Sequence, residues 1–389
     1  MRPENERPVV VYHHRTQGVD AQGIHVREMC KAFEGLGCRV AKVSVYSEER
    51  AGQDSRPGLA ARIIKTLPAW AYEALELGYN LVGIPRLYRA VRVNRPLFIY
   101  ERYSLFNLCG MAVSRLTGTP LVLEVNSPLA WEKSHHGSLV LKRLAQSLET
   151  LIVNQAGRTV AVTAVLKDML VRQGARPEKI VVMPNAVNLE EFQGLEEPDR
   201  EPTSPVTLGF AGWFRPWHGL SEMLGALDDH GVFGLGARLL LVGDGPARPD
   251  VEKVIAERGL GQGVTITGPA DRTALFGHLA SMDIALQPAA TAYASPMKLF
   301  EYLAAGKALV APDQANIREV VRDGETALLF APGDWPGLAR RVRELILDAD
   351  LRRRLGRAGR AWITENNRTW RVNAAKVMDM MSGHSPSGS

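Results

Sequence analysis

The chain has 389 residues, the length of about two or three domains. Its 47 Lys and Arg residues against 42 Asp and Glu residues give a formal net charge of +5, which permits anionic partners without indicating one. Hydrophobic residues make up 46% and charged residues 23% of the chain, as in soluble globular proteins, and no apolar run approaches the roughly 20 residues that cross a bilayer.

The N-terminal residues and the cysteines indicate a cytoplasmic, reduced protein. Residues 1–8 are polar and contain no apolar signal-peptide core, so we expect the chain to stay in the cytoplasm. Cys30, Cys38 and Cys109 are odd in number and lack the spacing of metal ligands. We interpret them as reduced side chains in the core.

Short apolar runs alternate with amphipathic stretches in the first half of the chain. We predict buried strands over residues 9–12, 39–45, 97–100, 120–125, 159–162 and 179–182. We predict helices over residues 24–36, 105–116, 139–156 and 164–173. This alternation is typical of a doubly wound α/β domain with a parallel sheet.

A polar loop that contains glycine is predicted over residues 13–23, at the carboxyl end of the first strand, where doubly wound folds bind ligands. Gly18 and Gly23 would let the backbone approach a phosphate, although a plain turn explains the same residues. His13 and His14 are either candidate ligand contacts or ordinary polar loop residues.

Residues 56–95 differ in character because basic and aromatic side chains are interleaved along them. Arg86, Arg89, Arg92 and Arg95 are evenly spaced and drift slowly around one helix face. A basic face with aromatic neighbours suits an anionic membrane surface, whereas the alternative is the solvated face of a packed helix. No known nucleic-acid motif accompanies the charge, so we expect no nucleic-acid partner.

The segment 124–128 follows another predicted strand and so lies at the same ligand-binding edge. Asn126 can form hydrogen bonds with a hydroxyl group but cannot act as a general base at neutral pH. Glu101, His135 and His136 are the titratable side chains expected nearby. We interpret the two histidines as mostly structural.

A change of composition divides the chain. Residues 193–205 contain four acidic residues and three prolines, which is typical of an exposed interdomain linker. We therefore predict a first domain over 1–192, a second over 206–369, a last helix over 370–381 and a disordered tail over 382–389. In the second domain we predict strands over 206–212, 237–242, 264–267, 283–288 and 308–311, and helices from 220 and over 248–259, 297–305, 335–347 and 350–366.

The stretch over residues 293–312 carries the clearest functional signal. Pro296 suits the first position of a helix, and Ser295 before it suits the N-cap. The free N–H groups of that first turn favour an anion, and Lys298 in the same turn can reach a phosphate. Glu301 lies one turn further on the same face, where it can hold a polyol such as a ribose. The alternative is that Lys298 and Glu301 form an ordinary surface pair.

The sequence Ser-Pro-Met-Lys-Leu-Phe-Glu-Tyr, from Ser295 to Tyr302, resembles the donor-site segment of the family 4 glycosyltransferases. One branch of that family has Ser-Pro-x-Lys-Leu-x-Glu-Tyr here, whereas many members carry a second glutamate at the position of Tyr293. Pro-Asn-Ala-Val-Asn at 184–188 and Val-Gly-Asp-Gly-Pro at 242–246 resemble two further segments of the family. The likeness extends over residues 9–381 and is stronger in the second half.

The resemblance implies a GT-B fold, in which two doubly wound, Rossmann-like α/β domains face each other across a cleft and the C-terminal helix crosses back to the N-terminal domain. It implies that a sugar moves, with retention, from a UDP- or GDP-linked donor in the second domain to a hydroxyl acceptor in the first. The nucleotide sugar is a substrate, and we expect no cofactor. We also expect no metal, because the only Asp-x-Asp, at 348–350, is far in sequence from the donor motifs.

The family pattern and the predicted ligand-binding edges together give candidate roles for individual residues. The residues implied to bind the donor are Gly23, Arg215, His218, Gly243, Gly268, Ser295, Met297, Lys298 and Glu301. The candidate catalytic residues are Asn126 and Glu101, and the candidate acceptor contacts are His13 and His14. Trp213 and His218 stand where the family usually has Arg and Lys, so we expect Arg215 to supply charge and His218 to carry a charge that depends on pH.

The sequence leaves the acceptor open. A lipid-linked acceptor, in cell-envelope polysaccharide or glycolipid assembly at the inner face of the cell membrane, would suit the basic segment 56–95. A small-molecule natural product is the alternative. Three other functions also stay open: an NDP-sugar epimerase, an inverting transferase with Glu101 or His14 as its base, and a non-catalytic nucleotide-sugar-binding protein.

Overall fold

The computed structural model describes residues 7–16, 21–44, 68–135, 137–195 and 205–382. The chain divides into two compact units, the first formed by Met1–Pro184 with Trp370–Ser389 and the second by Asn185–Thr369. Residues 185–192, which we expected at the end of the first domain, belong to the second unit. The predicted features that lie outside the described residues are Gly18, His136, residues 56–67, residues 196–204 of the linker and residues 383–389 of the tail.

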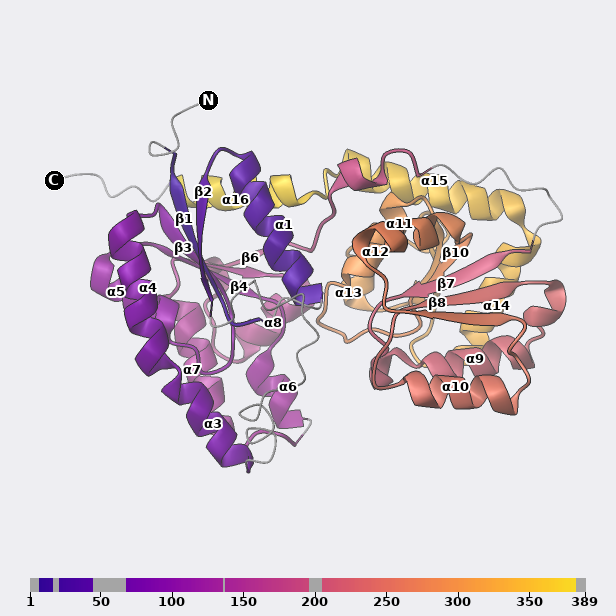
Figure 1. The fold of residues 1–389 in the computed structure, drawn as a ribbon, viewed down its shortest axis with the longest axis horizontal. Coiled ribbons are helices and arrows are strands. Elements are labelled where there is room, and N and C mark those ends of the chain that lie inside the picture. Colours follow the sequence, from indigo (N-terminus) through magenta and orange to yellow (C-terminus); the bar gives the residue numbers. More distant parts are fainter. Residues whose placement is uncertain (1–6, 17–20, 45–67, 136, 196–204, 383–389) are drawn as a thin grey trace. The chain divides into compact units, whose positions relative to one another are not determined.

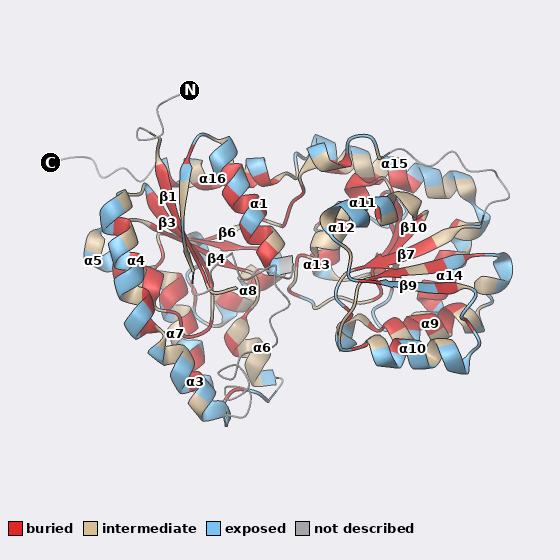
Figure 2. Ribbon diagram, viewed as in Figure 1, coloured by how far each residue is buried: buried red, intermediate tan, exposed pale blue. Residues whose placement is uncertain are grey.

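In the first unit, the described residues form a parallel sheet with the strand order β2-β1-β3-β4-β5-β6 (Figure 1). The strands are β1 (Val9–His14), β2 (Arg39–Ser44), β3 (Phe98–Arg102), β4 (Leu121–Val125), β5 (Arg158–Ala161) and β6 (Ile180–Val182). The helices are α1 (Ala21–Gly35), α3 (Ala69–Gly78), α4 (Asn80–Asn94), α5 (Cys109–Thr117), α6 (Leu129–His135), α7 (Lys142–Gln155), α8 (Ala164–Arg172) and α16 (Trp370–Ser382). The strands β1, β3 and β4 are buried along their whole length, as expected when helices cover both faces of a parallel sheet (Figure 2).

The C-terminal helix α16 belongs to the first unit, as predicted (Figure 1). It packs along α1, where Arg371 Nη1 donates a hydrogen bond to Gly35 O at 3.3 Å. The rings of Trp370 and His25 meet edge to face, with 4.7 Å between their centroids. These contacts attach the end of the chain to the unit that its beginning forms.

In the second unit, the described residues form a parallel sheet with the strand order β12-β11-β10-β7-β8-β9 (Figure 1). The strands are β7 (Thr207–Ala211), β8 (Arg238–Val242), β9 (Val264–Gly268), β10 (Ile284–Leu286), β11 (Ala308–Pro312) and β12 (Leu328–Phe330). The helices are α9 (Leu220–Asp229), α10 (Arg248–Glu257), α11 (Arg272–Ser281), α12 (Met297–Ala304), α13 (Ala315–Arg318), α14 (Trp335–Leu347) and α15 (Ala349–Glu365).

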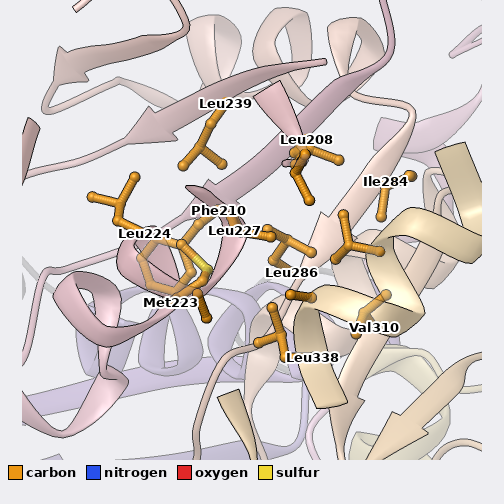
Figure 3. Packing of buried hydrophobic residues seen from close by; sticks show 14 of the residues in the cluster. Leu208, Phe210, Met223, Leu224, Leu227, Leu239, Ile284, Leu286, Val310 and Leu338 are labelled. Atoms are coloured by element: carbon orange, nitrogen blue, oxygen red, sulfur yellow. The ribbon is translucent and has the colours of Figure 1, made fainter. Parts of the chain in front are cut away.

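One hydrophobic cluster of the second unit forms where α9 and α14 pack against one face of the sheet. Figure 3 shows strand residues such as Phe210 and Leu286 against Met223 and Leu224 of α9 and Leu338 of α14. These side chains are almost completely buried. This core fixes the strands whose carboxyl ends carry the polar loops.

In each sheet the strand order reverses beside the first strand of the unit. β1 lies between β2 and β3, and β7 lies between β8 and β10. Doubly wound folds bind ligands outside the carboxyl ends of the strands at such a reversal. The fold therefore directs attention to the loops that follow β1 and β7.

The structure corrects the loop that was predicted over residues 13–23. β1 continues through His13 and His14, which are 0% and 6% exposed and are strand residues rather than loop residues. α1 begins at Ala21, so Gly23 lies inside a helix and not in a ligand-binding loop. We predicted a loop because these side chains are polar. Their hydrogen-bond partners lie in elements that are distant in the sequence, so the local pattern did not reveal them.

No bounds were predicted for six of the described α-helices and strands, which are α3, α4, α6, α11, α13 and β12. In α11 the apolar residues do not gather on one face, so the sequence lacks the usual signal of a packed helix. His135, expected in a loop, is the last residue of α6.

A carboxyl group is buried in the first unit without a cationic partner among the residues that the structure describes. Glu149 of α7 is 0% exposed and accepts a hydrogen bond from Ala130 N at 3.2 Å. Burial raises the pKa of Glu149 to about 7, although the hydrogen bond from Ala130 opposes this shift. The folded chain therefore keeps a proton on Glu149 at pH values where the unfolded chain has released it.

We expect this group to make the protein less stable as the pH rises from about 5 to about 7, by up to about 1.4 kcal/mol for each pH unit. Replacing Glu149 with glutamine removes the ionisation but keeps a hydrogen-bond acceptor. The Glu149→Gln variant should therefore gain stability relative to the wild type at pH 7.5 compared with pH 5.5. Urea unfolding at both pH values measures the difference, and equal pH dependence in the two proteins would contradict the prediction.

Candidate functional site

Part of the predicted donor site assembles at the carboxyl end of β7 in the second unit. Gly212 follows β7 with a φ angle of +144°, and a Cβ at this position would lie 3.0 Å from Lys298 Nζ. Lys298 lies in the first turn of α12. The strand end and the helix start can approach each other this closely because residue 212 has no side chain.

Lys298 is a buried cation whose ammonium group has no hydrogen-bond partner among the described residues. Its Nζ atom lies 3.8 Å from the centroid of the Phe210 ring, which provides a cation–π contact. Burial lowers the pKa of Lys298 to about 7, and the negative charge of Glu301 only partly opposes the shift. An anion that reached this ammonium group would gain charge-assisted hydrogen bonds.

Glu301 lies one turn after Lys298 and takes part in an ion pair that the sequence did not predict. Arg272 Nη1 donates to Glu301 Oε1 at 2.5 Å, and Arg272 Nη2 donates to Glu191 Oε2 at 2.6 Å. The side chain of Glu301 is only 12% exposed, and burial raises its pKa while Arg272 opposes the rise. Lys298 and Glu301 are therefore not the ordinary surface pair that the sequence left as an alternative.

His218 closes the loop after β7, at the end of the short turn Pro216–His218, η5 in the chain order. Its Nδ1 accepts a hydrogen bond from Arg215 N at 3.3 Å, and its ring meets the ring of Phe210 at 5.1 Å. Burial lowers the pKa of His218 to about 2, and the positive charge of Lys298 adds to the shift. The expectation that this histidine carries a pH-dependent charge is therefore wrong, because the ring is neutral at physiological pH.

Arg215 is a half-buried cation of the same loop. Its guanidinium group lies over the ring of Trp217, 5.3 Å from the centroid. Trp217 and Trp213 are both 50% exposed. The loop therefore combines a neutral imidazole, a guanidinium group and two exposed aromatic rings.

Glycine residues join the loops that follow β7, β8 and β9. Gly243 N donates to Gly268 O at 2.9 Å, and both glycines have positive φ angles, of +136° and +76°. A Cβ on Gly243 would overlap the carbonyl oxygen of Gly212. The structure therefore explains Gly243 by the packing of loops against each other, in addition to the predicted approach of a ligand.

The predicted capping of α12 is wrong. The N-cap of this helix is Pro296, without a side-chain hydrogen bond, and Met297 is the first helical residue. Ser295 is buried, and its Oγ accepts a hydrogen bond from Asn185 N at 3.1 Å. Asn185 Nδ2 also donates to the Ser295 carbonyl at 2.6 Å. Ser295 thus joins α12 to the Pro-Asn segment instead of capping the helix.

In the first unit, Asn126 is oriented by a buried carboxylate that the sequence analysis missed. Glu124 accepts hydrogen bonds from Asn126 Nδ2, from Arg102 Nη1 at 2.6 Å, from Tyr100 OH at 2.7 Å and from His25 Nε2 at 2.8 Å. Burial alone would raise the pKa of Glu124, but His25 and Arg102 hold it well below its usual range. A glutamate inside an otherwise apolar strand was the signal that would have found this group.

His13 and Glu101 form a second buried network in the first unit. His13 Nδ1 lies 2.5 Å from Glu101 Oε2, and the same oxygen accepts a hydrogen bond from Gly110 N at 2.9 Å. His13 Nε2 lies 3.3 Å from Tyr79 OH. Because His13 and Glu101 are 0% and 1% exposed and His14 is 6% exposed, none of them presents an exposed base. This burial weighs against the inverting alternative.

The described residues contain no group of three or more His, Cys, Asp or Glu side chains that could hold a metal ion. Among the described helices, none combines the length and apolar character that a membrane span requires.

Two known families match separate segments of the chain. Residues 205–348 match the family described as "Glycosyl transferases group 1", and residues 21–186 match the "Glycosyl transferase 4-like domain". The chain belongs to the family 4, group 1 glycosyltransferases. Lys298, Glu301 and Arg272 all lie in the segment that matches the group 1 family.

Two relatives illustrate the range of this glycosyltransferase family. The chain is 25% identical over 256 residues to the alpha-D-kanosaminyltransferase of Streptomyces kanamyceticus, and the aligned region covers 62% of this chain and 65% of that protein. It is 31% identical over 154 residues to a GDP-mannose-dependent alpha-(1-6)-phosphatidylinositol monomannoside mannosyltransferase of Mycobacterium tuberculosis, which covers 38% of this chain and 40% of that protein. The matched regions thus span less than two-thirds of either relative.

The fold also matches solved structures. HepE of Anabaena, crystallised in complex with UDP, aligns with 96% of this chain and 99% of its own, with a TM-score of 0.72 and 14% identity. At this identity the likeness concerns the fold, which is the predicted GT-B fold of two Rossmann-like domains.

The lowered pKa of Lys298 leads to a prediction for the binding of an anion at this site. Above about pH 7, Lys298 in the free protein loses its proton. Binding of a diphosphate to the charged ammonium group therefore requires Lys298 to take up a proton. We expect the affinity for UDP to fall as the pH rises from 7.5 to 9, by up to about tenfold for each pH unit. Isothermal titration calorimetry in two buffers of different ionisation enthalpy measures both the affinity and the proton uptake.

The matched control is Lys298→Arg, since a guanidinium group stays charged over this range. Its UDP affinity should change little between pH 7.5 and 9. A pH dependence equal to that of the wild type would show that another group takes up the proton.

Proposed function

We propose that this glycosyltransferase moves a sugar from a UDP- or GDP-linked donor to a hydroxyl acceptor, with retention of the anomeric configuration. The observation that carries the proposal is the buried ammonium group of Lys298, which lies beside the end of β7 and one turn before Glu301. This arrangement offers one positive group for a diphosphate and one carboxylate for the adjacent ribose. Both residues fall where the family resemblance places its donor site.

In this proposal the diphosphate is the leaving group, and its developing negative charge is stabilised by fixed positive groups. Lys298 would contact the phosphate, and Arg215 would add a second charge from the neighbouring loop. His218, which is neutral, would contribute a hydrogen bond rather than a charge. The departing phosphate oxygen would receive the acceptor proton on the same face, so the reaction needs no exposed protein base.

The nucleotide and the sugar are proposed only as classes. UDP is supported by the fold shared with HepE, which was crystallised with UDP. GDP is supported by the mannosyltransferase relative, whose name specifies GDP-mannose. In either case Glu301 would accept hydrogen bonds from the ribose hydroxyl groups, a contact that both nucleotides can make.

A test of the donor site replaces Glu301. We expect Glu301→Ala to weaken UDP or GDP binding by about 10- to 100-fold, as when hydrogen bonds to a charged group are lost. Thermal shift and calorimetry with both nucleotides and their sugars would measure the effect and identify the donor. Unchanged affinity in a folded variant would remove Glu301 from the site.

Turnover distinguishes the transferase from the alternatives. A transferase should release nucleoside diphosphate from its donor in the presence of a hydroxyl acceptor, whereas an epimerase would interconvert free nucleotide sugars. A protein that binds the donor but never releases nucleoside diphosphate, even by slow hydrolysis, would fit the non-catalytic alternative.

For the acceptor side we propose the first unit and, within it, the end of β4. Asn126 is half-buried there, and Glu124 holds its amide in one orientation. We propose that Asn126 forms a hydrogen bond with a sugar hydroxyl. Glu101, His13 and His14 are buried, so we propose that they support this edge of the sheet rather than contact the acceptor.

We propose a lipid-linked acceptor at an anionic membrane surface. In α4, the residues Asn80, Gly83, Leu87 and Val91 face the interior, whereas Arg86, Arg89 and Arg92 are exposed. Exposed apolar side chains accompany this basic face, among them Trp70, 62% exposed, and Leu81, 82% exposed. The phosphatidylinositol mannoside acceptor named for one relative supports a lipid, while the kanosaminyltransferase supports the small-molecule alternative.

Flotation with liposomes tests the membrane proposal. We expect the protein to float with vesicles that contain anionic lipid at low salt and to stay behind at high salt, because exposed charges are screened. Changing Arg86, Arg89 and Arg92 together to Glu should abolish flotation. The matched control changes three exposed arginines of α15 (Arg353, Arg354 and Arg357) to Glu, and an equal loss in that control would contradict a role specific to α4.

A further inference from the structure

Arg272 occupies a position that neither the sequence motifs nor the family resemblance singled out. It is the first residue of α11, next to Asp271, whose side chain caps the helix by accepting a hydrogen bond from Ala274 N at 2.8 Å. The guanidinium group therefore projects from a fixed helix start. It lies over the ring of Phe276, 4.7 Å from the centroid.

The guanidinium group of Arg272 joins two carboxylates from different elements. Its Nη1 donates to Glu301 Oε1 at 2.5 Å, while its Nη2 and Nε donate to Glu191 Oε2 at 2.6 Å and 3.3 Å. Glu191 belongs to the short turn Leu189–Phe192 (η4). Because three of the guanidinium N–H directions are used, Arg272 has little freedom to rotate.

An aromatic contact supports the same bridge. Phe192 is 1% exposed and meets Phe276 edge to face at 5.1 Å. The ring of Phe276 therefore contacts both Phe192 and the guanidinium group of Arg272. The turn that carries Glu191 and the helix that carries Arg272 are held together by an ion pair and by ring packing.

This bridge determines which oxygen of Glu301 can meet a ligand. Within the described residues Arg272 occupies Oε1, so Oε2 is the oxygen left for further hydrogen bonds. Lys298 lies one turn away, but its ammonium group makes no hydrogen bond to Glu301 among the described residues. Arg272 is therefore the cation that compensates and orients this carboxylate.

We propose that Arg272 is a positioning residue for the donor nucleotide: it holds Glu301 by Oε1 so that Oε2 faces the ribose, and Glu191 holds Arg272 in place. This inference rests on the proposed function of Glu301. It adds two residues to the donor site, Arg272 and Glu191, neither of which contacts the nucleotide. Donor affinity then depends on the turn at residues 189–192, which follows the Pro-Asn segment.

A double-mutant cycle tests the proposal by calorimetry with UDP and GDP, using whichever nucleotide the wild type binds. Arg272→Ala and Glu301→Gln should each weaken binding by about 10- to 100-fold. Glu301→Gln removes the charge of the carboxylate, and Arg272→Ala removes the group that orients it. In the Glu301→Gln background, Arg272→Ala should have no further effect. Arg272→Lys should restore part of the affinity, since lysine keeps the positive charge but lacks the planar guanidinium group that contacts Glu301 and Glu191 together.

Two further variants complete the test. Glu191→Gln, which leaves Arg272 and Glu301 intact, should weaken binding by about three- to tenfold and serves as the test if Arg272→Ala fails to fold. The matched control is Arg318→Ala, which removes an arginine that pairs with Asp313 in the same unit. Nucleotide affinity should be unchanged in this control.

The outcomes separate this inference from the proposed function. If Glu301→Gln binds nucleotide as well as the wild type, the proposed donor site is wrong. If Glu301→Gln weakens binding but neither Arg272→Ala nor Glu191→Gln does, the positioning role is wrong. If Arg272→Ala weakens binding equally in both backgrounds, Arg272 acts independently of Glu301, and the proposal is also overturned.

Discussion

The buried ammonium group of Lys298 is the interaction on which the second unit's polar site depends. A cation is costly to bury, and among the described residues the Phe210 ring and the neighbouring Glu301 offset the cost. Glu301 is itself buried and needs Arg272, which in turn is held by Glu191. Positive and negative side chains therefore alternate from the end of β7 to the turn at residues 189–192. Each charge is tolerated because the next one lies beside it.

The two units handle buried charge in different ways. In the first unit, Glu124 is surrounded by donors from four side chains, and its negative charge is stabilised within the chain. Glu149 is equally buried but has no cation beside it in the described part of the chain, so its pKa moves in the opposite direction. In the second unit, Lys298 keeps its donors unused among the described residues. In the proposed function, an anion takes up these unused donors.

The sheets themselves are generic, and the chemistry lies in the loops after their strands. A protein with 14% identity has the same fold, because apolar strands and helices with many different sequences can form it. The loops after β7 and β8 pack closely because Gly212 and Gly243, both at positive φ angles, carry no side chain. Gly268, also at a positive φ angle, accepts a hydrogen bond from Gly243 N. These glycines, together with Lys298 and Glu301, are the positions where the resemblance to the family is most informative.

The local sequence pattern was sufficient to predict the class of fold, most of the strands and the helix of the donor segment. It also predicted that this helix ends just before Gly306, whose φ angle is +68°. The same pattern showed that Lys298 and Glu301 share a helix face. It did not reveal Arg272, which is 29 residues from Glu301, or the pairing of Ser295 with Asn185, which is 110 residues away. Periodicity records which side chains are buried, but a polar side chain inside a fold takes its partners from elements that only tertiary packing brings together. The sequence by itself thus determined the architecture and two charged groups, and the tertiary structure decided how those groups are held.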